Sequence, residues 1–500
     1  MIYRLATAFI TLSTGFAAPA LADVNAADFW SNQQAFYGAL GATLSGDMSG
    51  DQLNNPEINV ILPQGIVSFQ IKADNVTMTD NSDGTVTINY PSPMTISIAG
   101  GVADEGGFSA TATMTHDGYT VTASGEPGDI FYEFNGQNMQ LVIGDISVDG
   151  AEPEGMNIEG WMTLTDWIGT TRVTEGNLIT YSASSEIGTT NVDFSFSADN
   201  VSSQSSQITL PMTSAIEMTL PSGGSDVLNL STALRDGLSV VLQSTGEGCS
   251  SSAVTMMDGA LLTNQTTSTG PQDFDLTFND DGLAVTGSAS DFTMVLNDPM
   301  MFPGDLEFGI DAISLDYDVP LNASDAPQDF RVATGLSGIT ISDAIWDMFD
   351  PSRHLPRDTA EILFDVTGMG TNGMDLLNFE ALAQLFGPPP IQIDEVTIEN
   401  LRIAAVGAEA TATGAITFDW TDFQTIPGIA RPEGAVTVNL NGANALMDTL
   451  VAMGLIPEGD LVMPRMMMGM FATPVGDDML ESVLEVNSEG HVLANGQRLQ

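Results

Sequence analysis

Alternation of apolar and hydroxyl-bearing residues is the dominant pattern along the chain. In residues 76–90, valine, methionine, isoleucine and tyrosine alternate with threonine on both sides of Asp83-Gly84. A period of two residues predicts β-strands, and an Asp-Gly pair between two such runs predicts a tight turn. This segment therefore predicts a β-hairpin.

The same pattern returns along most of the chain and predicts further hairpins. One face of each expected strand is apolar, and the other carries threonine, serine, asparagine and aspartate, which is typical of antiparallel sheets that face water on one side. The predicted fold class is mainly β, with one or more long, curved antiparallel sheets built of hairpins and a few amphipathic helices covering the ends. The expected turns lie at His116-Asp117-Gly118, Asn135-Gly136, Glu175-Gly176, Asp281-Gly282 and Glu489-Gly490.

Helical spacing of apolar residues is confined to short segments. An N-terminal helix is expected within residues 26–41, and another short one around residues 225–237. We divide the chain into an N-terminal helix with a hairpin sheet, residues 23–235, and a C-terminal β-rich region, residues 236–500. Within the second region, helices are expected near residues 341–350, 373–386, 442–454 and 460–472.

The first residues have the features of a cleavable signal peptide, assigned to residues 1–22. Arg4 precedes a short apolar run, and Ala20-Leu21-Ala22 supplies the small residues that signal peptidase recognises. The run is shorter than the roughly 20 residues that a membrane span needs. We expect an exported, periplasmic protein with no transmembrane segment after cleavage; the alternative is an uncleaved N-terminal anchor.

The charge is strongly negative and narrows the range of partners. The chain has 65 acidic and 11 basic residues, for a formal net charge of -54. Nucleic acids and anionic membrane surfaces are disfavoured, because contacts with phosphate need arginine and lysine. The acids form either a solvated surface or carboxylate clusters that bind cations, although no calcium-loop motif is present. We expect no cofactor and no metal.

Candidate catalytic chemistry is sparse. Cys249 is the one cysteine, and His116, His354 and His491 are the three histidines. The chain contains no H-E-x-x-H, no G-x-S-x-G and no phosphate-binding loop. We therefore expect no enzyme and assign no catalytic residue. The alternative is an acidic periplasmic hydrolase acting on glycan or ester substrates, with His354 beside a serine or with converging carboxylates.

Residues 341–366 bring a tryptophan together with two arginines and a histidine, in a chain with few basic residues. Trp346, Arg353, His354 and Arg357 lie between a helical pattern and a strand pattern, among several aspartates. One interpretation is a helix-to-strand corner in which Arg357 pairs with Asp350 or Asp358. The other is a binding site for an anion or another substrate on the two arginines. The four residues are the candidate binding residues of the chain.

Five methionines cluster in residues 463–470. Flexible thioethers fill gaps in cores, but they also form adaptable apolar surfaces, and they are ligands for soft metals. The pattern alone leaves these alternatives open.

Two blocks resemble the DUF2125 family of exported alphaproteobacterial proteins. The first is W-D-M-F-D-P followed by L-P-R-D, in residues 346–358, and the second is residues 432–457 followed by M-M-M-G-M-F-A-T-P. The likeness extends over the chain that follows the signal peptide. The family brings no known activity. A further similarity to AsmA-like envelope proteins, whose long curved sheets carry lipid in an apolar trough, implies an envelope-associated binding or structural protein that holds a lipid or another apolar ligand. The oligomeric state stays open.

Overall fold

The structure is a computed structural model that describes residues 24–499, except 62–66, 103–105, 225–228, 303, 386–389 and 426–427. The expected signal peptide, residues 1–22, lies outside the described residues. Strands account for 62% of the chain and helices for 12%, and the strands form one antiparallel sheet. The predicted mainly β fold is confirmed.

The sheet begins with a hairpin and then divides into two walls. In the hairpin, β1 (Ala42–Ser49) pairs with β2 (Gln52–Ile61). The other edge of β2 is shared, because β4 pairs with Gln52 and Leu53 while β3 pairs with Glu57–Ile61. The first strand of each wall therefore pairs with β2.

The first wall consists of the strands that follow β4 in space. They are β4 (Val76–Asp80), β5 (Val86–Asn89), β8 (Thr120–Glu126), β9 (Asp129–Gly136), β12 (Trp167–Thr174), β13 (Leu178–Ile187), β16 (Met212–Pro221), β17 (Ser239–Gly246) and β20 (Gln272–Asn279).

The second wall consists of the strands that follow β3 in space. They are β3 (Val67–Ala73), β6 (Met94–Val102), β7 (Gly106–Thr115), β10 (Met139–Val148), β11 (Met156–Leu164), β14 (Thr190–Ala198), β15 (Val201–Thr209), β18 (Cys249–Met257) and β19 (Ala260–Thr269).

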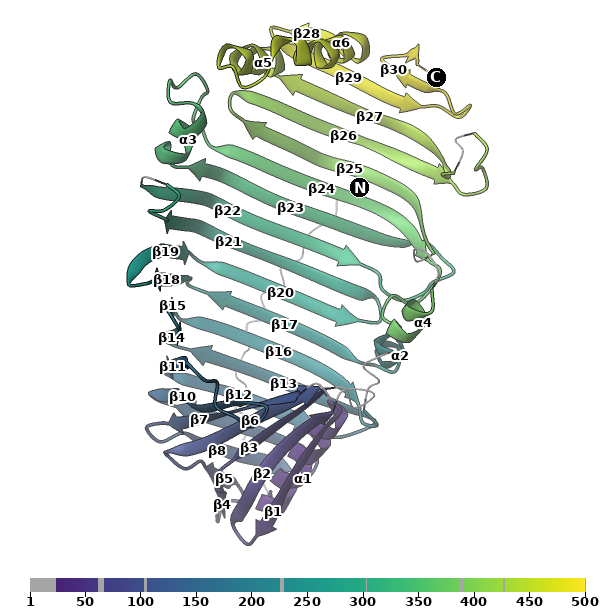
Figure 1. Ribbon diagram of the computed structural model, residues 1–500. Helices are drawn as coiled ribbons and strands as arrows, with labels where there is room; N and C mark the ends of the chain where they lie inside the picture. Colours follow the sequence, from purple (N-terminus) through teal and green to yellow (C-terminus); the bar gives the residue numbers. More distant parts are fainter. Residues whose placement is uncertain are drawn as a thin grey trace.

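Successive hairpins alternate between the walls. β4–β5 belongs to the first wall, β6–β7 to the second, and β8–β9 to the first again. The short connections between walls bond to one another along one edge, which we call the crease. Examples are Asp117 N–H to Gln137 O at 3.1 Å and Leu210 N–H to Gly248 O at 2.9 Å. Figure 1 shows the strands of both walls meeting along this edge.

Both walls rejoin on one long strand. β21 (Gly282–Asn297) pairs with β20 through residues 282–289 and with β19 through residues 293–297. The strands that follow are β22 (Asp305–Val319), β23 (Gln328–Ile341), β24 (Ala360–Asn372), β25 (Ile391–Ala405), β26 (Ala408–Asp419), β27 (Arg431–Asn441), β28 (Thr473–Gly476), β29 (Met479–Val486), β30 (Val492–Ala494) and β31 (Gln497–Arg498). From β21 the strands pair in chain order up to β27, which pairs with β29, and β29 pairs in turn with β28 and β30.

Two of the expected hairpins are wrong. The turn at His116-Asp117-Gly118 joins β7 to β8, but β7 pairs with β6 and β10 while β8 pairs with β5 and β9. The turn at Asn135-Gly136 leads from β9 to β10, but β9 pairs with β8 and β12 while β10 pairs with β7 and β11. Both turns lie at the crease, where the chain passes from one wall to the other. The Asp-Gly and Asn-Gly pairs reverse the chain, but local sequence does not determine which edge the next strand joins. The hairpins at Asp83-Gly84, Glu175-Gly176, Asp281-Gly282 and Glu489-Gly490 are confirmed.

The helices lie at the ends and edges of the sheet (Figure 1). Those expected near 341–350, 442–454 and 460–472 are confirmed. Within the range expected at 373–386, of which residue 386 lies outside the described residues, the helix is limited to Phe379–Ala383, and the Gly373 and Leu376 N–H groups bond to the Pro390 and Leu321 carbonyls instead. The division at residue 235 falls between β16 and β17, which pair with each other. The helices are α1 (Ala26–Ala39), α2 (Leu230–Arg235), α3 (Asp343–Phe349), α4 (Phe379–Ala383), α5 (Ala443–Ala452), the 3-10 helix η2 (Glu458–Leu461) and α6 (Val462–Phe471).

The main core lies between α1 and the first wall. Phe29 and Phe36 of α1 pack with fully buried wall residues such as Ile88 and Ile130. Asn25 caps the helix, since its side chain accepts hydrogen bonds from the Ala27 and Asp28 N–H groups. α1 thus covers the apolar side of the first wall at the N-terminal end of the sheet.

Candidate functional site: the apolar face of the sheet

One side of the sheet is apolar in both walls, and we call it the apolar face. Leu44 and Met48 lie four residues apart on one side of β1, where they pair with Ile58 and Leu53 of β2. Ile58 also pairs with Ile71 of β3 in the second wall, and Leu53 pairs with Val76 of β4 in the first wall. Paired residues of antiparallel strands point to the same side. The side of the first wall that packs on α1 is therefore continuous with the apolar side of the second wall.

The apolar face of the second wall is open. Ile71, Ile98, Phe108 and Phe194 expose between 37% and 43% of their surface, whereas Ile88 on the first wall is fully buried. The core that packs on α1 contains first-wall residues and no residue of β6, β7, β10, β11 or β14. α1, together with Ala233 and Leu234 of α2, covers part of the first wall, whereas apolar side chains of the second wall stay in contact with solvent.

The apolar face continues along the C-terminal strands. Ile362 of β24 pairs with Ile403 of β25, and Phe364 pairs with Leu401. Ile362, Phe364 and Ile403 are 42%, 39% and 49% exposed. Monomeric proteins rarely expose large contiguous apolar patches unless the patch binds something. This face is therefore the first candidate for a binding site.

A methionine-rich group of helices ends the face. α5, η2 and α6 lie together at the C-terminal end of the sheet (Figure 1). Met463, Met466, Met467 and Met470 expose about half of their surface or more, at 58%, 49%, 50% and 55%. α6 has no buried residue. Of the alternatives that the sequence left open, the geometry favours an adaptable apolar surface over a packed core.

The predicted binding residues Trp346, Arg353, His354 and Arg357 lie together at the corner between α3 and β24. Arg357 donates to Asp343, to Asp347 at 2.6 Å and to the Asp350 carbonyl at 2.9 Å. Its guanidinium carbon also lies 5.6 Å from the centre of the Trp346 ring.

Asp350 is the buried centre of this corner. Its carboxylate accepts the N–H groups of His354 and Leu355 at 2.9 and 2.8 Å and lies 3.1 Å from His354 Nδ1. Burial raises the pKa of Asp350, but these hydrogen bonds outweigh it and hold the pKa below its ordinary value. Arg353 pairs with Asp343 at 2.7 Å. Because both arginines already hold carboxylates, the arrangement favours the corner interpretation over an anion site.

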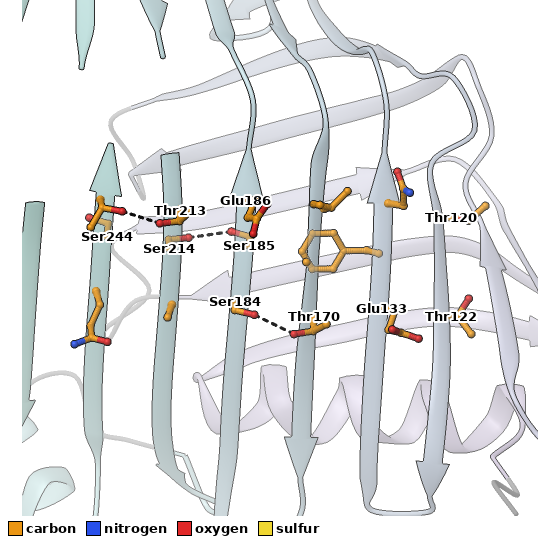
Figure 2. A pocket seen from close by; sticks show the side chains of 17 residues that line it. Thr120, Thr122, Glu133, Thr170, Ser184, Ser185, Glu186, Thr213, Ser214 and Ser244 are labelled. Atoms are coloured by element: carbon orange, nitrogen blue, oxygen red, sulfur yellow. Dashed lines mark hydrogen bonds between the residues drawn. The ribbon is translucent and has the colours of Figure 1, made fainter. Parts of the chain in front are cut away.

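A hydroxyl-lined depression lies on the opposite side of the first wall. Its volume is about 820 Å³, and its polar lining includes Glu133, Thr170, Ser184 and Glu186. Thr170 and Ser184 share a hydrogen bond of 3.0 Å. Figure 2 shows these side chains along adjacent strands, with a helix behind the wall. The depression is open, and three pairs of its hydroxyl groups bond to each other, namely Thr170 with Ser184, Ser185 with Ser214, and Thr213 with Thr245.

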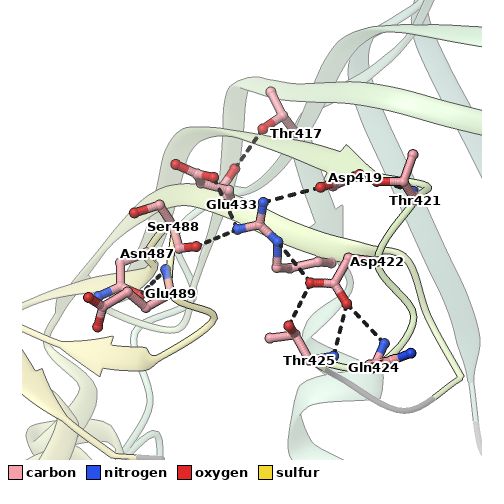
Figure 3. A network of polar contacts seen from close by, with 11 residues as sticks. Thr417, Asp419, Thr421, Asp422, Gln424, Thr425, Glu433, Asn487, Ser488 and Glu489 are labelled. Atoms are coloured by element: carbon pink, nitrogen blue, oxygen red, sulfur yellow. Dashed lines mark hydrogen bonds and ion pairs between the residues drawn. The ribbon is translucent and has the colours of Figure 1, made fainter.

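Arg431 ties the last strands together. Its guanidinium lies within 3.3–3.4 Å of carboxylate oxygens of Asp419, Asp422 and Glu433, and it donates to the Ser488 carbonyl at 2.8 Å (Figure 3). The hydrogen bonds from Thr421, together with Arg431, hold the pKa of Asp419 below its ordinary value. This network fastens the C-terminal hairpin to β26 and β27 and leaves the arginine no capacity for an anionic ligand.

The described residues show little reactive chemistry. The histidine rings contact the Pro91 carbonyl and the Tyr119 N–H (His116), Asp350 (His354) and Glu489 (His491), and none of these contacts is a serine hydroxyl. Among the described residues, no group of three or more histidine, cysteine or acidic side chains could hold a metal ion. None of the helices in the described ranges combines the length and apolar composition of a membrane span.

The structure defines a class: an antiparallel sheet folded along a crease, with one apolar side that is only partly covered. A profile of the family described as an uncharacterized protein conserved in bacteria, DUF2125, matches residues 229–490, and the chain belongs to this family. The match covers the C-terminal strands and α2 to α6, while most of both walls lies outside it. Comparisons with curated proteins and with solved structures found no match.

Proposed function

We propose that this protein is an exported, non-enzymatic binding protein of the bacterial envelope that holds a lipid or another apolar ligand along the apolar face. The observation that carries the proposal is the half-exposure of side chains such as Ile98, Phe194 and Phe364, on strands that share one side of one sheet. The signal-peptide pattern supports the export.

The physical argument rests on the cost of leaving this face in water. Removing apolar surface from water stabilises by roughly 25 cal/mol per Å². α1 covers part of the first wall only, and the second wall and β24 to β26 have no such cover among the described residues. A long acyl chain laid along the face would contact several strands in succession, so its binding energy would add up over its length.

Uptake by delipidated protein tests the proposal. We expect purified protein to bind a fluorescent phospholipid, and protein isolated from the periplasm to retain a lipid mass in native mass spectrometry. An absence of both uptake and retained mass would refute the proposal.

A matched pair of variants locates the binding. Phe194 and Trp161 are both 39% exposed, and they lie on neighbouring strands but on opposite sides, since Trp161 pairs with Asp193. Phe194→Asp places a carboxylate on the apolar face and should weaken uptake about tenfold, because desolvating a charge costs well over ~1.4 kcal/mol. Trp161→Asp should leave uptake unchanged. Equal effects of the two variants would place the ligand elsewhere.

A further inference from the structure

The basic residues between Lys72 and Arg465 are already engaged by carboxylates. From Lys72 to Arg465, each lysine and arginine forms an ion pair with at least one aspartate or glutamate. The pairs involve Lys72, Arg172, Arg235, Arg331, Arg353, Arg357, Arg402, Arg431 and Arg465. Proteins that hold phosphate or carboxylate groups do so mainly with arginine and lysine donors. An anionic headgroup would have to compete with a carboxylate for every one of these cations.

Carboxylates on the strands near Phe194 and in the depression lie on the side opposite the apolar face. Asp193 neighbours Phe194 in β14 and therefore points to the other side, as Glu133 and Glu186 do in the depression of Figure 2. With a formal net charge of -54, the field around the sheet repels anions and attracts cations.

On β14, β15, β18 and β19 the apolar face carries polar side chains but no charged one. Ser205 pairs with Phe194 and with Ala253, and Ala253 pairs with Gln265, so these residues of β14, β15, β18 and β19 share one side. Around them the face carries hydroxyl and amide groups. Ser251 and Thr267, for example, are hydrogen-bonded at 2.6 Å. These groups can bond to a polar headgroup, but they supply no charge that would neutralise an anion.

We propose that the apolar face takes amphiphiles whose polar end carries no net negative charge. This inference rests on the proposed function, since it specifies the class of ligand for the same face. The acyl chain lies on the apolar side chains, and the headgroup meets either the hydroxyl and amide groups of β15, β18 and β19 or the acidic field at the edges of the sheet. An anionic amphiphile makes the same apolar contacts, but its headgroup is repelled by the carboxylates, so it binds more weakly.

The test uses three phospholipids with the same fluorescent acyl chain and different headgroup charge. Phosphatidylcholine is neutral, ethylphosphatidylcholine is cationic and phosphatidylglycerol is anionic. Kd is measured by titration of the delipidated full-length protein, first at low salt and then at physiological salt. We expect the cationic probe to bind tightest and the anionic probe about tenfold more weakly than the neutral one at low salt. The differences should shrink as salt screens the charges.

The outcomes separate the two proposals. If none of the three probes binds, the proposed function fails. If all three bind with the same Kd, or if the anionic probe binds tightest, the proposed function stands and the inference about headgroup charge is overturned. A gap between probes that does not shrink with salt would also overturn it, because its cause would then not be the field of the carboxylates.

Discussion

The packing of α1 on the first wall includes one buried amide side chain, and replacing this residue gives a measurable prediction. The Asn32 side chain is fully buried. It accepts the Tyr132 hydroxyl at 2.5 Å and donates to Glu175 at 2.8 Å and to the Val173 carbonyl at 3.5 Å. Asn32→Leu keeps the size of the side chain and removes all three bonds. The Tyr132 hydroxyl would then remain buried without this partner.

The magnitude follows from the groups left unpaired. A buried donor or acceptor that loses its partner costs about 1–3 kcal/mol. Glu175 reaches solvent and recovers its hydrogen bond from water, so the cost comes mainly from Tyr132. The Gln33 side chain also lies within reach of that hydroxyl, and it reduces the penalty. We expect Asn32→Leu to lower the free energy of unfolding by about 1–2 kcal/mol.

A double-mutant cycle provides the decisive assay. Urea unfolding is followed by tryptophan fluorescence, since Trp30 lies on α1 and packs against the core. In a Tyr132→Phe background no hydroxyl is left unpaired, so Asn32→Leu should there cost close to nothing, because apolar replacement of both partners is nearly neutral. An equal loss in both backgrounds would show that the hydrogen bond does not hold the helix and would refute this reasoning.

Three further predictions concern the corner, the walls and the response to pH. Arg357→Met should lower Tm more than Arg353→Met, because the Arg357 side chain is 13% exposed and holds two aspartates, whereas that of Arg353 is 63% exposed and holds one; equal shifts in thermal unfolding would contradict the assignment of Arg357 as the fastener. Gly169→Ala should prevent or weaken folding, since a Cβ there would lie 2.3 Å from the Ser184 carbonyl oxygen and 2.5 Å from the Phe134 ring, whereas Gly223→Ala meets nothing within 4 Å and should be tolerated; circular dichroism and expression of the two variants compare them. Hydrogen bonds from Arg172 and Arg235 lower the pKa of Asp129 and Asp375. The two carboxylates therefore stabilise the fold above the unfolded pKa near 4, and this stabilisation is lost as pH falls through the lower folded pKa values. Burial raises the pKa of Tyr119 to about 12, so the contribution of this side chain to stability is present below pH ~10 and is lost as pH rises from there towards 12. A denaturation midpoint that stays constant below pH 4 and above pH 10 would contradict both.

Local sequence predicted the strands well and their partners only in part. Alternation identifies β4 and β5, and the turn at Asp83-Gly84 joins them as expected. The turns at Gly118 and Gly136 have the same chemistry but lie at the crease, where the next strand, β8 or β10, pairs with β5 or β7 of the other wall. The difference arises from pairing with strands that come much earlier in the chain, which a window of ten residues does not contain.

The candidate site shows the same division between local and distant information. The clustering of acids around Arg357 predicted ion pairs, but the expected partners were Asp350 or Asp358, and the structure shows Asp343, Asp347 and the Asp350 carbonyl. The helical turn of α3 decides this choice, because it brings Asp343 and Asp347 to one side. The one-sided apolar pattern predicted a face, while the extent of its exposure depends on where α1 packs.

The alternation of hairpins between walls gives the molecule a modular length. The shortest segment that adds two strands to each wall is a pair of consecutive hairpins, such as β8 to β11. Removing a single hairpin would leave one side of the fold two strands shorter and would misalign every later pairing up to β21. Insertions and deletions within this half of the chain should therefore be tolerated in units of four strands, which sets the smallest step by which evolution, or an engineer, can lengthen the apolar face.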